Sequence, residues 1–469
     1  MPIATTQDPS GASVPAPPAA SVLSPNDLAE RMTHRRAVQA VIWGMPAVNT
    51  DLMYQVMVRQ VNGGPNQIVY WSRLPDWKNQ TLTPNPDAIY VMPFFNTRQG
   101  PMVLEIPPAN GGSITGSVDD CWQTAMEDVG PAGADRGKGG RYLITPPGYA
   151  ETIPEGYIHL PSTNYQGYAL LRSILKSGSE ADVAQAVAYA RQIRFYPLSH
   201  AASPPPQTFL DAVDIVFDAT IPYDLRFFQS LDRMVQAEPW LDRDRAMIDV
   251  LRSIGIQKGQ PFDPDAKTQA TLAEAAREAR DWLAIRYEDA FTPYWEGAHW
   301  RLPVSRETLD GLQNQFANPD SYPVDGRGLT YTFAFFCPKH SGTGSAYLVA
   351  INDGAGQPLD GASAYRLHVP PDVPARQYWS ATAYDRRTHA LIRDMPWPSR
   401  SSDTPGLQAN PDGSVDLWFG PKPPAGGNSN WVPTSADGGF EIMFRFYGPE
   451  PALFDKSWRL PDVERRAVG

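Results

Sequence analysis

Residues 85–90 place an amide, a carboxylate and a phenol where a turn leads into a strand. Pro86 favours the turn, so we expect Asp87 to lie within it and to reach the same pocket as Tyr90. An acid beside a tyrosine can transfer protons to and from a bound molecule. The alternative is that an Asx-type turn merely starts a strand, and local spacing alone favours it.

A second candidate acid lies in segment 117–122, where strand alternation sends Val118, Asp120 and Trp122 to one face. A carboxylate on an apolar face is costly to bury unless it has a cation, a hydrogen-bond donor or a raised pKa. We therefore predict that Asp87 or Asp120 acts as a general base or cation ligand. The alternative is that Asp120 only anchors a loop through backbone amides. Its candidate partners are Tyr90, Lys138, Arg141, Arg172 and Arg445.

The glycine-rich loop 133–141 contains Lys138 and Arg141. Successive backbone amides, together with these two cations, can bind an anion. A tight hairpin loop is the alternative. Acids near this loop could hold a hard divalent cation, although solvated loop acids are the default interpretation. These acids are Asp119, Asp120, Glu127, Asp128 and Asp135.

The seven histidines never occur two or four residues apart, so a histidine-based metal site would need long-range folding. His368, on an expected strand, is interpreted as a structural hydrogen-bonding residue. The phosphate loop, the dinucleotide glycine fingerprint and the Gly-x-Ser-x-Gly elbow are absent, which argues against nucleotide-dependent chemistry. No cofactor is expected beyond a divalent cation on aspartates, and whether a metal binds stays open.

The elements that must position these residues change type along the chain. Ser24 can cap a helix over 28–45, which we expect Pro46 to stop. Short apolar runs with Pro and Gly turns predict strands up to residue 168, and helical spacing follows from 169 to 289. Strand patterns return over 331–336, 346–351, 365–369, 377–384, 415–419 and 440–447. The expected modules are a disordered tail, a helix with a β-sandwich, a helical middle and a second β module, at 1–24, 25–168, 169–328 and 329–469.

With 469 residues, the chain is too long for a single core. Its net charge of −11 comes from scattered acids without a basic stripe, so nucleic acid and anionic membranes are not expected as partners. No bilayer-spanning apolar stretch or signal-like start is present, and we expect a cytoplasmic protein. Cys121 and Cys337 give no disulfide framework. Abundant Trp and Tyr predict a homo-oligomer.

Several motifs together resemble a tandem of domain of unknown function 1254 followed by domain of unknown function 1214, from about residue 30 to 465. Ala88, Arg136 and Arg141 depart from the family, which more often has Thr at the first position and commonly has Lys at the other two. The first half carries WGMP (43–46), TPNPDAIY (83–90), DCW (120–122), EDVGPAGAD (127–135), GKGGRY (137–142) and PPGY (146–149). The second half carries DG (353–354), LDG (359–361), PARQYWS (374–380), NPDGS (410–414), NWVPT (430–434), RFYGP (445–449) and DKSWRL (455–460).

The resemblance implies a mainly β fold with an N-terminal immunoglobulin-like β-sandwich, a helical insert and a C-terminal jelly-roll-like β-sandwich. It implies no settled chemistry, and a fold alone does not supply one.

Our first hypothesis is an enzyme, with hydrolysis favoured, acting on a small-molecule substrate in a pocket between the two β modules. Asp87, Tyr90 and Asp120 are the predicted catalytic residues. Arg445 would clamp a carboxylate, and Trp122 and Trp379 would form apolar walls. Lys138, Arg141 and Arg172 complete the predicted substrate-binding residues. The alternative is a carbohydrate-binding, ligand-binding or assembly protein without catalysis, and a redox protein is the weakest hypothesis.

Overall fold

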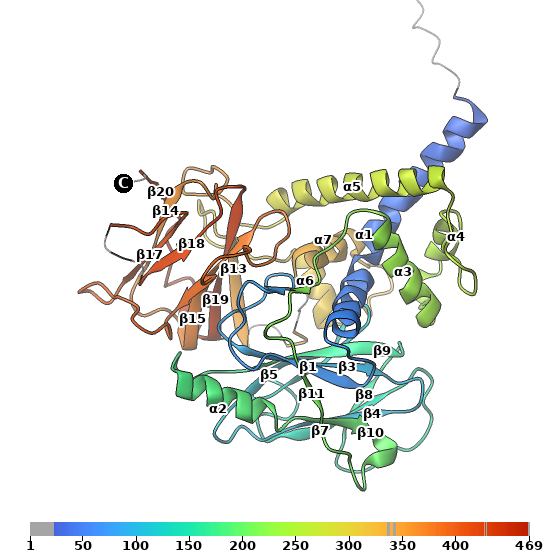
Figure 1. The fold of residues 1–469 in the computed structure, drawn as a ribbon, viewed down its shortest axis with the longest axis horizontal. Coiled ribbons are helices and arrows are strands. Elements are labelled where there is room, and N and C mark those ends of the chain that lie inside the picture. The colour runs from blue at the N-terminus through green and yellow to red at the C-terminus, as the bar shows by residue number, and fades with distance from the viewer. Residues whose placement is uncertain (1–22, 335–337, 341–343, 426, 428, 468–469) are drawn as a thin grey trace, which may run out of the picture.

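Two β-sandwiches and a layer of helices make up the computed structural model, which describes residues 23–334, 338–340, 344–425, 427 and 429–467. The mainly β fold with a helical middle agrees with the sequence prediction. Figure 1 shows the N-terminal sandwich at the bottom, the C-terminal sandwich at the upper left and the helices at the upper right, above the first sandwich. The immunoglobulin-like and jelly-roll-like strand orders stay predictions.

The first helix, α1 (Pro25–Gln60), starts at Ser24, whose side chain accepts a hydrogen bond from the Asp27 amide in a capping box. We expected Pro46 to end this helix, and that expectation is wrong, because α1 continues for 14 residues beyond it, to Gln60. Proline removes the hydrogen bond to the Ile42 carbonyl. Residues 43–51 are all buried, so tertiary packing outweighs the lost bond.

The N-terminal sandwich packs a six-stranded sheet, in the order β11-β1-β3-β9-β5-β6, on a four-stranded sheet, β10-β4-β7-β8. Alternate side chains from both sheets, such as Val91 and Leu104, fill one core between them. The opposite face of the six-stranded sheet packs against α1 through Met92 and Phe94. A separate two-stranded sheet pairs β12 with β2. The strands of this part of the chain are β1 (Gln67–Tyr70), β2 (Asn79–Gln80), β3 (Ile89–Asn96), β4 (Met102–Ile106), β5 (Ile114–Asp120), β6 (Ala125–Val129), β7 (Gly140–Thr145), β8 (Ile158–Pro161), β9 (Gln166–Ser173), β10 (Arg194–Pro197), β11 (Phe209–Asp211) and β12 (Phe217–Asp218).

This sandwich extends past the expected boundary at residue 168. Strand β9 occupies most of the segment 169–175 that we expected to be helical, and β10, β11 and β12 also follow residue 168. The short helix α2 (Glu180–Ala190) is an excursion between two strands of the sandwich. Alternation of Tyr168, Leu170 and Arg172 on one face was the missed strand signal.

The helical layer surrounds α1. Helices α3, α5 and α7 pack around it, and their apolar faces form one core that includes Trp43 and Leu231. The helices are α3 (Leu225–Ala237), α4 (Met247–Arg252), α5 (Ala266–Asp289), α6 (Arg306–Gln313) and α7 (Val324–Phe333). Residues 331–333, expected to be a strand, end α7 because they pack into this helical core, and residues 335–336 lie outside the described residues. None of the helices described is both long and apolar enough to cross a bilayer.

The C-terminal sandwich packs two four-stranded sheets, β13-β19-β15-β16 and β18-β17-β14-β20. Its core contains Trp379 stacked on Phe444, with ring centroids 5.5 Å apart. The elements are β13 (Ser345–Ala350), β14 (Ala364–Val369), β15 (Ala375–Asp385), β16 (Ser399–Ser401), β17 (Val415–Gly420), β18 (Trp431–Pro433), β19 (Phe440–Pro449), α8 (Pro451–Phe454) and β20 (Glu464–Arg466).

Candidate functional site

The outer face of the C-terminal sheet is polar but buried. On β15 and β19, one set of alternate residues fills the sandwich core, and the other set points outward. The outward set would face water in an isolated sandwich, whereas here the N-terminal module and the helical layer cover it. Its members are Tyr378, Ser380, Thr382 and Tyr384 on β15, and Glu441, Met443, Arg445 and Tyr447 on β19.

A pocket lies where this face meets β3 and β9. Tyr90 of β3 is paired with Arg172 of β9, and both line the pocket together with Tyr347 and Arg445 of the C-terminal sheet. The pocket contains about 670 Å³ of space free of protein atoms, its mouth included. Polar groups from both modules therefore line one common pocket, as they do in small-molecule sites.

Hydrogen bonds from Asn85 tie the two modules together at this pocket. Its backbone amide donates to the Tyr90 hydroxyl over 2.7 Å. Its side-chain amide donates to the hydroxyls of Tyr378 and Tyr447, both over 2.8 Å. The Tyr90 oxygen also accepts from Arg172 Nε over 3.3 Å. With two donors on its oxygen, the Tyr90 hydroxyl is left to donate its own proton to a ligand.

Arg445 is 2% exposed and is positioned by neutral groups. Its guanidinium donates to Thr382 Oγ1 over 3.2 Å and to the Thr83 carbonyl over 2.8 Å. It also lies over the rings of Tyr347 and Tyr384, 5.3 and 5.5 Å from their centroids. Within the described part of the chain, Arg445 forms no ion pair with a carboxylate inside 4.0 Å. A buried cation of this kind favours an anionic ligand.

Tyr347 lies beside both arginines. It is paired with Arg445 across β13 and β19, and its hydroxyl accepts a hydrogen bond from Ser345 Oγ over 3.0 Å. Burial works to raise the pKa of Tyr347, but the positive charges of Arg172 and Arg445, with the Ser345 hydrogen bond, outweigh it and lower that pKa. The pKa of neighbouring Tyr447 is raised, first by burial and next by Tyr347. Tyr347 is therefore the phenol of this pair that gives up its proton first.

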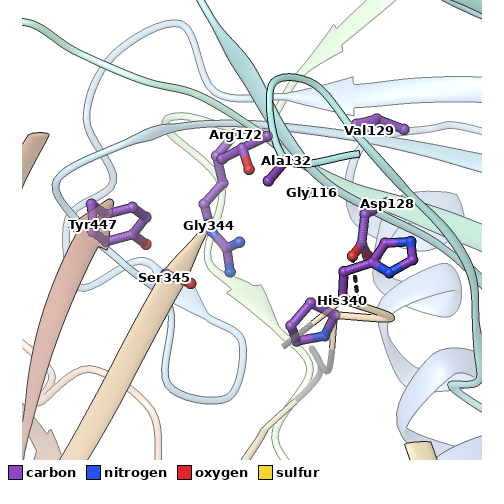
Figure 2. Close-up of a pocket in the computed structure, with 11 residues that line it drawn as sticks. Gly116, Asp128, Val129, Ala132, Arg172, His340, Gly344, Ser345 and Tyr447 are labelled. Carbon is purple, nitrogen blue, oxygen red and sulfur yellow. Dashed lines mark hydrogen bonds between the residues drawn. The ribbon is translucent and has the colours of Figure 1, made fainter. Parts of the chain in front are cut away.

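A smaller cavity continues on the other side of Arg172, with about 380 Å³ free of protein atoms. Figure 2 shows Arg172 reaching between Tyr447 on one side and Asp128 and His340 on the other. The Asp128 carboxylate accepts from the amides of Lys339 and His340 over 2.9 and 2.7 Å. Arg172 thus borders two cavities and can contact a ligand in either one.

Asp87 does not line these cavities. It opens instead into a neighbouring pocket of about 810 Å³ with Trp397, Arg400 and Asp403. Ser399 Oγ donates to both carboxylate oxygens of Asp87, over 3.1 and 3.0 Å. Burial raises the pKa of Asp87 to about 6, although Ser399 and Arg445 oppose the shift. Burial and the charge of Asp87 likewise raise the pKa of Asp403 to about 6. This second pocket therefore contains two carboxyl groups whose pKa values are raised to about 6.

Asp120 anchors a loop through backbone amides, which was the alternative to a catalytic role. Its Oδ1 accepts hydrogen bonds from the amides of Trp122 and Thr124, both over 2.9 Å. Its charged neighbours are Arg243 and Arg327 of the helical layer, in place of the five predicted partners. Trp122 packs on Trp43 in the helical core, with ring centroids 4.7 Å apart, because the chain turns after Asp120. Neither residue lines the inter-module pocket.

The glycine-rich loop and Trp379 also lie away from the pocket. Lys138 and Arg141 are exposed, and Arg141 stacks on Tyr157. The carboxylate of Asp135 accepts hydrogen bonds from the loop amides of Gly130 and Gly139, so these amides are already satisfied within a tight loop. Trp379 has the strand parity that points into the C-terminal core. Of the predicted residues, Tyr90, Arg172 and Arg445 are brought together.

Sequence reasoning missed Tyr347, Tyr447 and Asp403. The alternation of Arg445 and Tyr447 with Phe444 and Phe446 along one strand was the available signal for Tyr447. Asp403 follows a short strand and carried no local signal. In the described residues, no three side chains of His, Cys, Asp or Glu come together as metal ligands.

Fold and site together define a two-sandwich protein with a buried arginine–tyrosine pocket. Two family models match in tandem: "Protein of unknown function (DUF1254)" over residues 65–197 and "Protein of unknown function (DUF1214)" over residues 344–451. The chain belongs to the proteins that carry these two domains in tandem. The resemblance inferred from the motifs is thus confirmed.

One solved structure indicates a shared fold. The chain is similar to the VPA0106 protein from Vibrio parahaemolyticus, with 18% identity, a TM-score of 0.57, and coverage of 93% of this chain and 100% of that one. A putative uncharacterized protein from Burkholderia cenocepacia matches with 12% identity and a TM-score of 0.39, over 94% of each chain. The search of curated proteins found no match.

Proposed function

We propose that the protein is a hydrolase that binds a small organic molecule with an anionic or carbonyl group in the pocket lined by Tyr90, Arg172, Tyr347 and Arg445. The observation that carries the proposal is the position of the Tyr347 phenol beside two buried guanidinium groups contributed by different modules. A phenol in such surroundings can act as a general base. The guanidinium groups can stabilise negative charge that develops on a carbonyl oxygen.

In the proposed reaction, the Tyr347 phenolate removes a proton from water while the water oxygen forms a bond to the carbonyl carbon. The carbonyl electrons move to its oxygen, and the resulting oxyanion faces Arg445. When the oxyanion collapses, the bond to the leaving oxygen or nitrogen breaks. That atom takes the proton held by Tyr347, and the products are a carboxylic acid and an alcohol or amine. Tyr90 donates a hydrogen bond that orients the substrate.

Asp87 and Asp120 have no step in this scheme because neither lines the pocket. Asp87 supports the alternative that the protein binds carbohydrate without catalysis. Its pocket combines two carboxyl groups with Trp397, whose ring can stack on a sugar. Saturable binding in a glycan screen, together with silent esterase, amidase and glycosidase panels, would favour that alternative.

The test compares the wild type with Tyr347→Phe on a panel of carboxylic esters, amides and lactones. The variant keeps the ring and loses the hydroxyl, so we expect kcat/KM to fall by about 10²- to 10⁴-fold, the usual contribution of a general base. Tyr365→Phe is the matched control, because the Tyr365 hydroxyl accepts a buried hydrogen bond from the Asp360 amide within the other sheet. Full turnover by Tyr347→Phe, or a wild type inactive on the whole panel, would refute the proposal.

The homo-oligomer and the cytoplasmic location also stay proposals, and the first rests on the aromatic content of the sequence. Light scattering at micromolar concentration and cell fractionation test them.

A further inference from the structure

An apolar pocket adjoins the arginine–tyrosine pocket. It contains about 1220 Å³ free of protein atoms, its mouth included. Its walls come from the segment before α6, from α6 itself, from the edge strand β13 and from α8. The apolar lining residues are Leu302, Pro303, Val304, Leu309, Leu312, Ala346, Leu348, Leu453 and Phe454.

The two pockets share a wall. Tyr347 and Pro303 line both of them. Ser345, which donates to the Tyr347 hydroxyl, lines the apolar pocket and the smaller cavity beside Arg172. One side of this wall is therefore cationic and hydrogen-bonding, whereas the other side is lined mainly by aliphatic and aromatic side chains.

Solvent reaches the apolar side chains that line this pocket. Phe454 at its edge remains 49% exposed, while Leu453 beside it is buried. Apolar surface that is left open in this way marks a place where an apolar group binds. Because Tyr347 and Pro303 line both pockets, a single ligand that occupied both would place its apolar part here and its polar group beside the arginines.

We propose that the substrate is amphipathic, with a carboxylate or carboxylic ester held beside Arg172, Tyr347 and Arg445, and an aliphatic chain in the apolar pocket. This inference rests on the proposed function for its polar half. It adds that binding free energy grows with chain length, because each added CH₂ group leaves water. A fully buried CH₂ contributes about 0.8 kcal/mol, which is about fourfold in affinity.

The first experiment measures binding of acetate, butanoate, hexanoate and octanoate to the full chain by calorimetry. These carboxylates are the cleaved acid, so their binding requires no catalysis. We expect Kd to fall by about two- to fourfold per added CH₂. Equal affinities along the series, or no binding of any member, would overturn the inference.

The second experiment fills the pocket with Val304→Trp. This variant should bind acetate like the wild type and lose the gain on going to octanoate. Ile285→Trp is the matched control, because Ile285 is 62% exposed on α5 and lies outside the pocket. Thermal midpoints of both variants show whether each still folds. If a folded Val304→Trp keeps the full chain-length dependence, the chain binds elsewhere and the inference fails.

The outcomes separate the inference from the proposed function. A chain-length dependence abolished by Val304→Trp, with no ester hydrolysed, would refute the hydrolase and retain the amphipathic ligand. Hydrolysis that is lost in Tyr347→Phe but independent of chain length would support the hydrolase and refute the amphipathic ligand. Saturation of the pocket by a peptide, with no binding of carboxylates, would show a protein-docking surface and overturn the inference.

Discussion

The ionised carboxylate of Asp87 lowers the unfolding free energy of the protein, and Asp87→Asn should remove this effect. Burial raises its pKa from 3.8 to about 6, so the folded chain holds this proton more tightly than the unfolded chain does. A group of this kind stabilises the fold less as pH rises. Below about pH 4 both states are protonated and the cost is absent. It develops as pH rises to about 6 and is fully present above that pH.

The magnitude follows from the shift. About two pKa units, at 1.36 kcal/mol each, correspond to about 3 kcal/mol at neutral pH. Asparagine keeps an acceptor for Ser399 Oγ and cannot ionise. Relative to the wild type, Asp87→Asn should therefore gain about 3 kcal/mol of unfolding free energy between about pH 4 and pH 8. The gain should be slightly larger if the pKa of Asp403 falls as well, since Asp87 helps to raise it.

Urea unfolding at several pH values measures this difference, with fluorescence and circular dichroism compared to detect separate transitions of the modules. Asp242→Asn is the control, because that carboxylate is fully exposed and its loss leaves no desolvation cost to relieve. A stability difference between Asp87→Asn and the wild type that stays constant over the pH range would refute the reasoning. If Asp87→Asn became less stable than the wild type as pH rises, the charge of Asp87 would be favourable in the folded protein.

Two further predictions concern the helical layer. Gly328→Ala would place a Cβ 2.7 Å from the Ile42 carbonyl, so it should lose about 1 to 3 kcal/mol in urea unfolding. Gly64→Ala meets no atom within 4 Å and should stay within about 0.5 kcal/mol of the wild type. Cys121 is fully buried, and burial raises the pKa of its thiol, so mass spectrometry should find it unalkylated by iodoacetamide until urea unfolds the chain.

The sequence predicted several residues of the pocket but not the directions in which the side chains point. Tyr90, Arg172 and Arg445 converge as expected for an inter-module site. Trp379 illustrates the limit, because its position in a shared motif suggested a pocket wall, whereas the strand parity observed in β15 turns it into the core and points Tyr378 toward the site. Parity follows from which face of a sheet is covered, and that depends on a module distant in sequence.

The prediction that Pro46 ends the first helix was wrong for the same physical reason. Local rules end a helix there, but those rules do not include the layer of helices that buries α1 on several sides. The Asp120 prediction failed differently. Its alternation argument treated 117–122 as a regular strand, whereas the pairing of β5 with β6 shifts register after Val118 and the chain turns at Asp120.

The division of the pocket between two modules has a consequence for biosynthesis. Tyr90 and Arg172 belong to the first sandwich, and Tyr347 and Arg445 belong to the second. During translation, the N-terminal sandwich leaves the ribosome first, with Arg172 on the sheet face that α1 also packs against. The pocket closes only when the last long strand, β19, has emerged. A chain truncated after the N-terminal sandwich would present only Tyr90 and Arg172 and could not form the pocket.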